Sequence, residues 1–177
     1  MKAWNTYYKG IFEYVPGKKV TGVDVANRTL LVEGIEEFKG DVVNFIPPQR
    51  AAAIAAKAGL VGEDKKWCPV NVTTFESTLQ KNIHVIGDSA IAGAMPKSGY
   101  SANSQAKVCA INVVALMNGK ELTELSGINV CYSAISDHES ISVAGVYTVK
   151  DGKIIGVPDS GGISPVDFSM TKAEHAY

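Results

Sequence analysis

The sequence contains few of the residues that identify several common classes of protein. It has three cysteines and three histidines among 177 residues, and no two cysteines are spaced as C-x-x-C. Structural zinc sites need clustered cysteines and histidines, and a complete disulfide framework needs an even number of cysteines, so neither is predicted. On composition alone, Cys68, Cys109 and Cys131 are expected to be ordinary buried or half-buried thiols.

Positive charge is not in excess either, since 17 Lys and Arg residues stand against 18 Asp and Glu residues. A basic surface is typical of nucleic-acid binding, which the composition therefore disfavours. Residues 108–119 form an uncharged stretch, but a membrane span needs roughly 18 or more apolar residues. The first residues also have no apolar segment of a secretory signal. We expect a soluble α/β or α+β protein with no nucleic-acid partner and no membrane span.

The first part of the chain has the pattern of β structure. Short runs of near-alternating polarity predict strands at residues 11–15, 20–25 and 29–33, joined by tight turns. Such a three-stranded meander needs another layer to cover its apolar face. Residues 41–46 predict a buried strand that ends at Pro47, because proline cannot donate a ladder hydrogen bond.

The middle of the chain predicts two helices. The alanine-rich residues 50–58 have high helix propensity, and a compact apolar strand is expected at residues 83–86. Ser101 is a candidate N-cap for a long helix over about residues 102–118. Four apolar residues at helical spacing predict its buried stripe: Val108, Ile111, Val114 and Ala115.

The last third predicts a β-sheet and no further helix. Strands are expected at residues 127–136, 140–149 and 153–157, with Asp151-Gly152 as the turn of a hairpin. The polar tail, residues 161–177, predicts irregular structure. Too few βαβ units are present for a complete doubly wound nucleotide-binding fold.

Three short segments carry candidate chemistry, each with a plain structural alternative. Asp88 follows a glycine at a predicted strand end, where its carboxylate can accept hydrogen bonds from a ribose or ribityl hydroxyl, or can simply occupy a turn. Residues 97–102 lead into the long helix, whose N-terminal N–H groups favour an anion or carbonyl, although a capped helix has the same residues. Cys131 is either a redox thiol beside an electron-accepting cofactor or a small side chain buried in a sheet.

Further segments stand in a fixed order along the chain. They are NFIPPQRA at 44–51, WCPV at 67–70, TFES at 74–77, HVIGD at 84–88, MPKSGYSANSQ at 95–105, Cys131-Tyr132-Ser133 and VPDSGG at 157–162. Together they resemble the C-terminal part of the flavoprotein subunit of flavocytochrome c sulfide dehydrogenase, and are similar to the related flavoprotein of the Sox sulfur-oxidation system. The resemblance covers most of the chain from about residue 13, and the segment 95–105 is its most specific part.

The resemblance implies a glutathione-reductase-like disulfide oxidoreductase. Such a flavoprotein binds FAD, oxidises sulfide and passes electrons to a c-type cytochrome subunit in the periplasm. Residues 1–43 would then be the end of a middle-domain β-meander, 44–119 the second half of the FAD-binding domain, and 120–177 a mainly β C-terminal flavin-binding domain. The C-terminal domain is expected to be mainly β with a helix.

The resemblance also implies roles for particular residues. Cys131 matches the family's C-terminal redox cysteine, which lies over the flavin and pairs with a cysteine of the middle domain. Asp88 would bind the ribityl chain, and the start of the long helix would stabilise the reduced, anionic flavin. The residues expected to bind FAD are Pro47, Gly87, Asp88, Lys97, Ser98, Gly99, Tyr100, Ser101 and Ala102.

The sequence departs from the family pattern in ways that predict a fragment. It contains no GxGxxG dinucleotide motif, and Ser89-Ala90 follow the Gly-Asp pair where the family often has a cysteine. The partner of Cys131 would lie upstream of Met1, since neither other cysteine has its place in the family order. We therefore expect a truncated flavoprotein that is inactive alone and that self-associates through a face left bare.

Two alternatives stay open from the sequence. A sulfide:quinone oxidoreductase-like enzyme would need amphipathic surface to reach the bilayer, and residues 159–177 show no such stretch. A stand-alone interaction module would keep the fold and bind a partner without redox chemistry.

Overall fold

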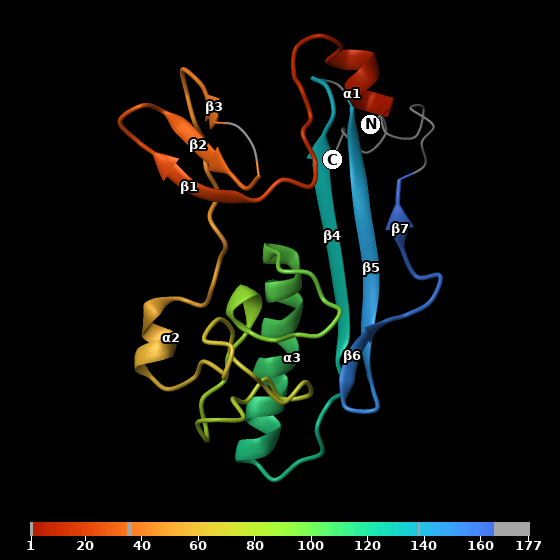
Figure 1. Ribbon diagram of the computed structural model, residues 1–177. Helices are drawn as coiled ribbons and strands as arrows, with labels where there is room; N and C mark the ends of the chain where they lie inside the picture. The colour runs from red at the N-terminus through yellow and green to blue at the C-terminus, as the bar shows by residue number, and fades with distance from the viewer. Residues whose placement is uncertain (1, 35–36, 138, 165–177) are drawn as a thin grey trace. The chain divides into compact units, whose positions relative to one another are not determined.

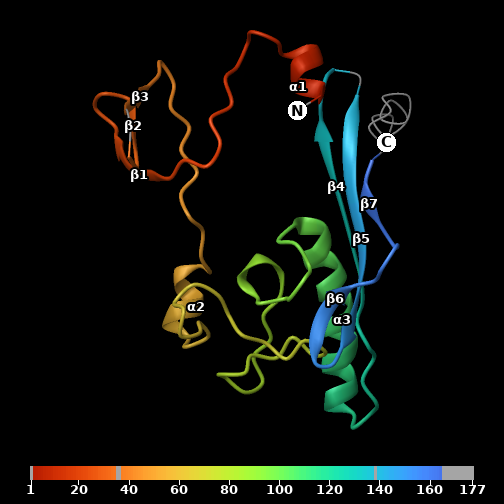
Figure 2. The same ribbon diagram turned by 45° about the vertical axis from the view of Figure 1, so that its right-hand side comes forward.

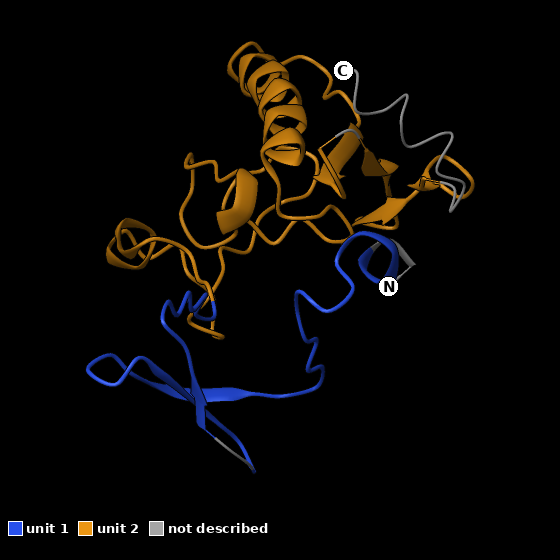
Figure 3. Cartoon of the chain, turned by 90° about the horizontal axis from the view of Figure 1, so that it is seen from above, with its two compact units in different colours: residues 1–48 blue, residues 49–177 orange. Residues whose placement is uncertain are grey.

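The computed structural model, shown in Figure 1 and turned in Figure 2, describes residues 2–34, 37–137 and 139–164. Figure 3 colours its two compact units, residues 1–48 and residues 49–177. Both units combine helical segments with antiparallel strands. The predicted mixture of α and β structure with a β-rich C-terminal part is confirmed at this level.

The first unit is a short helix followed by a meander. Helix α1 covers Lys2–Tyr7, and the strands are β1 (Val20–Asp24), β2 (Thr29–Val32) and β3 (Glu37–Lys39). The strands pair in the order β1-β2-β3, each antiparallel to the next. A three-stranded meander is therefore present, as predicted, but it starts and ends later in the chain than expected.

The strand predicted at residues 11–15 is wrong. Phe12 and Tyr14 instead pack edge-on against the ring of Trp4, with centroid distances of 5.1 and 5.2 Å. Alternating apolar residues form a strand only where another strand pairs with them, and here the aromatic rings gather around a helix residue instead.

The buried strand predicted at residues 41–46 is also wrong. Val42 is 88% exposed and Ile46 is 73% exposed, and neither lies in a described strand. The meander ends at Lys39, and the two prolines that follow residue 46 have no N–H groups for a ladder. An apolar run next to two prolines is an extended connection here.

The second unit begins with α2 (Ala53–Lys57), which is shorter than the predicted helix over residues 50–58. Gly59 ends it with a φ of 68°, a left-handed conformation that glycine adopts without strain. A 3₁₀ turn, η1 (Gly87–Ser89), and the long helix α3 (Gly99–Met117) follow. The strand predicted at residues 83–86 is reduced to an isolated bridge between His84 and Glu76.

The sheet of the second unit is the most accurately predicted part. Its strands are β4 (Ser126–Ala134), β5 (Ser140–Lys150) and β6 (Lys153–Gly156), in antiparallel order, and the short β7 (Gly162–Ile163) also pairs with β5. Asp151 and Gly152 have φ values of 50° and 69°, which is the conformation of the expected two-residue hairpin turn. Strand β7 was not predicted, and residues 165–177 lie outside the described part.

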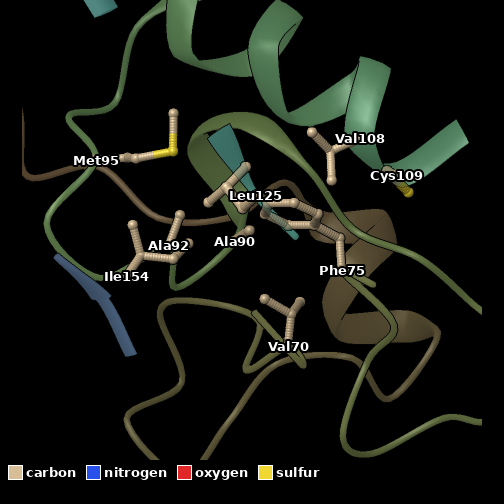
Figure 4. Close-up of a cluster of buried hydrophobic side chains, with 9 residues drawn as sticks. All are labelled: Val70, Phe75, Ala90, Ala92, Met95, Val108, Cys109, Leu125 and Ile154. Carbon is tan, nitrogen blue, oxygen red and sulfur yellow. The ribbon is translucent and has the colours of Figure 1, made fainter. Parts of the chain in front are cut away.

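Helix α3 packs against β4, and the loops between α2 and α3 complete the core (Figures 1 and 2). Figure 4 shows the buried cluster, in which Phe75 is fully enclosed at 0% exposure. Its members come from the loops, α3, the start of the sheet and β6: Val70, Phe75, Ala90, Ala92, Met95, Val108, Cys109, Leu125 and Ile154.

The inward face of α3 is more polar than the sequence pattern suggested. Ser101, Gln105 and Asn112 are 1%, 1% and 0% exposed, whereas Ile111 and Val114 of the predicted buried stripe are 52% and 58% exposed. Side-chain hydrogen bonds permit this burial, because a buried polar group costs little only when it is paired. The prediction for Val108 and Ala115, the other members of the stripe, is confirmed, since both are buried.

Asn112 makes three such bonds. Its Nδ2 donates to the carbonyl oxygens of Thr73 at 2.7 Å and Thr123 at 2.9 Å, and its Oδ1 accepts from the Thr123 N–H at 2.8 Å. One amide therefore joins α3 to the loop before η1 and to the segment that leads into β4.

Replacing this amide should weaken the second unit. The Asn112→Ala variant leaves the three main-chain groups without partners, and we expect it to lower the free energy of unfolding by about 2–3 kcal/mol. Asn103→Ala is the matched control, since Asn103 is exposed on the same helix, and it should change stability by less than about 0.5 kcal/mol. Urea unfolding followed by circular dichroism measures the stability of both variants. An Asn112→Ala midpoint equal to that of the unchanged chain would contradict this role of Asn112.

Candidate functional site

The predicted cofactor residues Gly87 and Ala102 are brought together where η1 meets α3. The Gly87 N–H donates to Gln105 Oε1 at 2.7 Å, and Gly87 has a φ of 70°. A Cβ atom on Gly87 would lie 3.3 Å from the Cβ of Ala102. Glycine is thus required here by both backbone conformation and the close approach of the helix.

Lys97 is exposed, and its side chain reaches the same region. Its Nζ donates to the carbonyl oxygens of Asp88 and Ala90, the latter at 3.1 Å, and lies 3.8 Å from the ring centroid of Trp67. Partial desolvation of its ammonium lowers the pKa of Lys97, and the nearby Asp88 carboxylate and Cys68 partly oppose that shift. The two hydrogen bonds connect the loop before α3 to the segment that contains η1.

Helix α3 begins one turn earlier than the sequence suggested. Ser98, and not Ser101, is its N-cap, and the Ser98 Oγ accepts a hydrogen bond from the Ser101 N–H at 3.1 Å. The first-turn N–H groups of Gly99 and Tyr100 have no hydrogen-bond partner in the part of the chain that the structure describes. A Cβ placed on Gly99 would meet nothing within 4 Å, so the space beside this helix end is open.

A buried amide connects this helix end to Cys131. Asn129 Oδ1 accepts hydrogen bonds from Ser98 Oγ at 2.5 Å and from Ser101 Oγ at 3.1 Å. Asn129 Nδ2 lies 3.4 Å from the Sγ of Cys131. Residues two apart on a strand face the same way, so β4 directs both side chains toward the start of α3. The structure thereby joins two predicted site segments that are far apart in sequence.

Cys131 is one of the exposed residues of β4. In Figures 1 and 2, β4 and β5 continue beyond the N-terminal end of α3. Cys131 is exposed, and it pairs across the sheet with Val143, which in turn pairs with Ile163. Val143 is 44% exposed and Ile163 is 72% exposed. The thiol is therefore accessible and has an apolar row beside it.

The two other cysteines are in different surroundings. Cys68 is 0% exposed and Cys109 is 8% exposed, and burial raises the pKa of both thiols above the ordinary value. Lys97 partly offsets this shift for Cys68. Within the described residues none of the three cysteines forms a disulfide. The expectation that Cys109 is a plain core residue is confirmed.

A small cavity of about 130 Å³ lies next to the contact between η1 and α3. Gly87, Met95, Lys97, Gln105 and Trp67 line part of it. Sites for cofactors of moderate size usually enclose about 300–1,000 Å³. The cavity is therefore too small to hold such a cofactor by itself, and the described residues would supply one wall of a larger site.

The residues present fit a flavin at that wall. The Asp88 side chain is exposed, and no hydrogen bond to its carboxylate is found from the described residues, so it can accept from a ribityl hydroxyl. The free N–H groups at the start of α3 and the charge of Lys97 suit a carbonyl or an anionic ring. The described part of the chain holds no cluster of three or more metal-ligating side chains.

Pro47 and Tyr100 remain to be placed. Pro47 belongs to the first unit, and its position beside the flavin stays a prediction. Tyr100 is 51% exposed at the start of α3.

Sequence reasoning missed Asn129 and Gln105. The signal for Asn129 was a polar residue two positions before Cys131 on one strand. For Gln105 it was a polar residue seven positions after Ser98, on the same helix face.

A protein-family comparison agrees with the resemblance seen in the sequence. Residues 124–177 match the family model described as flavocytochrome c sulphide dehydrogenase, flavin-binding. The matched segment contains β4 to β7 and therefore Cys131. The predicted kinship of the C-terminal part is confirmed, and its flavin-binding character agrees with FAD as the cofactor.

The three thiols should differ sharply in reactivity. We expect iodoacetamide at pH 7.5 to modify Cys131 alone in the folded chain, because Cys68 and Cys109 are buried and their raised pKa values keep them protonated. Above about pH 9, Cys68 and Cys109 should be labelled only in the fraction of molecules in which local or global unfolding exposes them. Intact and peptide mass spectrometry count and locate the adducts, and a first adduct on Cys68 would contradict the described burial.

Proposed function

We propose that this chain, whose residues 124–177 match the flavin-binding domain of flavocytochrome c sulfide dehydrogenase, is the C-terminal part of an FAD-dependent enzyme that oxidises sulfide. The observation that carries the proposal is the connection from Cys131 through Asn129 to the start of α3. That connection links the candidate redox sulfur to the free helix N–H groups that suit a flavin.

The chain's own residues would hold one side of the cofactor. Asp88 would accept a hydrogen bond from the ribityl chain, and Gly87 lets η1 lie close against α3 so that both reach the same ligand. Gly99 and Tyr100 would donate their main-chain N–H groups to the ring system. When bound, FAD supplies a two-electron acceptor that releases electrons singly.

Cys131 would take part in a redox disulfide with a cysteine of the complete flavoprotein other than Cys68 and Cys109. A hydrosulfide anion attacks one sulfur of the disulfide, and a new S–S bond forms to the sulfide sulfur. The original S–S bond breaks, and the displaced cysteine sulfur leaves with the bonding pair as a thiolate. The exposure of Cys131 supports this role, because a buried thiol would not be accessible to sulfide.

Family kinship supports the remaining parts of the proposal. We propose a glutathione-reductase-like fold for the complete subunit, with residues 1–43, 44–119 and 120–177 as parts of its three domains. A c-type cytochrome subunit would accept the electrons, in the periplasm. In the described part of the chain, no helix has the length and apolar character needed to cross a bilayer.

We further propose that the chain alone is catalytically inactive, since it offers only one wall of the flavin site. It would also self-associate through the outer face of α3, where Ile111, Val114 and Met117 are 52%, 58% and 81% exposed. These residues follow at a spacing of three and form an apolar strip on one side of the helix.

The redox role of Cys131 is tested in the complete flavoprotein with its cytochrome. We expect Cys131→Ser to abolish sulfide-dependent cytochrome reduction, a loss of at least about a thousandfold, while the flavin absorbance spectrum and FAD content stay unchanged. Cys109→Ser is the control, because Cys109 is a buried core residue, and it should keep turnover. Wild-type turnover in the Cys131→Ser protein would disprove the assignment.

Self-association is tested with the chain alone by sedimentation velocity. We expect dimers or larger species at tens of micromolar, and a shift toward monomer in Val114→Lys because a charge opposes burial of the strip. Lys107→Ala is a control on the exposed surface of the same helix. A strict monomer over the whole concentration range would contradict this proposal.

A further inference from the structure

The side chain of Asn129 lies between Cys131 and the start of α3, and it is only 2% exposed. Its Oδ1 accepts from the hydroxyls of Ser98 and Ser101, so the oxygen end of the amide is occupied. Its Nδ2 end therefore faces Cys131, whose Sγ lies 3.4 Å away. A buried amide with both ends engaged has its orientation fixed by its partners.

We propose that Asn129 is a positioning residue for Cys131, holding its sulfur at the N-terminal end of α3. The catalytic meaning of this inference rests on the proposed function. The contacts themselves belong to the chain and are testable without cofactor, sulfide or cytochrome.

The two ends of the amide offer the sulfur unequal partners. Cys131 Sγ also lies 3.7 Å from Asn129 Oδ1, but that oxygen already accepts from two serine hydroxyls. A thiolate instead accepts from the Nδ2 N–H group. A hydrogen bond to an ionised acceptor is the stronger kind, so the Nδ2 contact is the one through which the amide can hold the sulfur. The thiolate is the leaving group and the nucleophile of thiol–disulfide exchange.

The hydroxyls of Ser98 and Ser101 connect the Asn129 amide to the start of α3, so the position of Cys131 depends on the helix cap as well as on β4. Ser98 accepts from the Ser101 N–H and donates to Asn129 Oδ1, so the cap and the amide form one connected set of bonds. Cys131 is thereby fixed relative to the first turn of α3. Any group bound at that turn would have the sulfur at a defined position.

The test measures the alkylation rate of Cys131 by iodoacetamide between pH 6 and pH 10 in the chain as it stands. We expect Asn129→Ala to slow alkylation at pH 7 about fivefold, because the donor to the thiolate is lost. At pH 10 the two rates should lie closer together. Asn129→Asp should be slower still at pH 7, because a carboxylate beside the sulfur opposes its negative charge.

Ser104→Ala is the matched control. Ser104 Oγ accepts from the Ile128 N–H at 3.1 Å, so this change breaks another bond between α3 and β4 without touching Cys131. Its pH profile should equal that of the unchanged chain. A profile that shifts equally in Ser104→Ala would show that any loosening of the junction has the same effect, and would overturn the inference.

Cys68 and Cys109 report on folding in the same experiment, since unfolding makes both of them reactive. An unchanged pH profile in Asn129→Ala, with both buried cysteines still protected, overturns the proposal. If Asn129→Ala and Asn129→Asp unfold, Ser98→Ala takes their place. It removes one hydroxyl from the amide oxygen, and we expect a slowing of about twofold at pH 7. No slowing would again overturn the inference.

This outcome is separate from that of the proposed function. A shifted pH profile together with normal sulfide oxidation by the Cys131→Ser flavoprotein would leave Asn129 as a positioning residue and remove the enzyme assignment. An unshifted profile together with an inactive Cys131→Ser enzyme would keep the enzyme assignment and remove Asn129 as a positioning residue.

Discussion

The hydrogen bonds of Asn129 are the interaction on which the candidate site depends. They connect β4, which carries Cys131, to the cap of α3, where the free main-chain N–H groups lie. Two neighbouring amides act in the same way, because Gln105 accepts from Gly87 and Asn112 joins α3 to two flanking segments. Buried polar groups that are fully paired define one arrangement, whereas apolar contacts alone tolerate many.

This polar junction explains how so little regular structure supports a site. Much of the chain between α2 and α3 is loop with isolated bridges, and its order comes from the apolar cluster around Phe75 and from side-chain hydrogen bonds to the main chain. Lys97 contributes through its bonds to the Asp88 and Ala90 carbonyls. The family match, to a flavin-binding domain, covers the strand that carries Cys131, and the proposed flavin contacts lie at the helix beside that strand.

The parts of the fold that depend on local signals were predictable from the sequence. The hairpin turn at Asp151-Gly152 and the end of α2 at Gly59 follow from residues that favour a left-handed backbone, and the structure has both. The parts that depend on a distant partner were not. Residues 41–46 have the composition of a buried strand, but no strand pairs with them. Asn129 was missed because its importance comes from Ser98 and Ser101, about thirty positions away.

The redox role of Cys131 is tested most directly by measuring whether its sulfur is in a disulfide before sulfide is added and free afterwards. In the complete flavoprotein with FAD bound, free thiols are blocked with one alkylating reagent, a single equivalent of sulfide is added, and newly exposed sulfur is labelled with an isotopically distinct reagent. The account predicts that Cys131 escapes the first reagent, being in a disulfide, and takes the second as thiol or persulfide. Labelling of Cys131 by the first reagent, before sulfide is added, would contradict it.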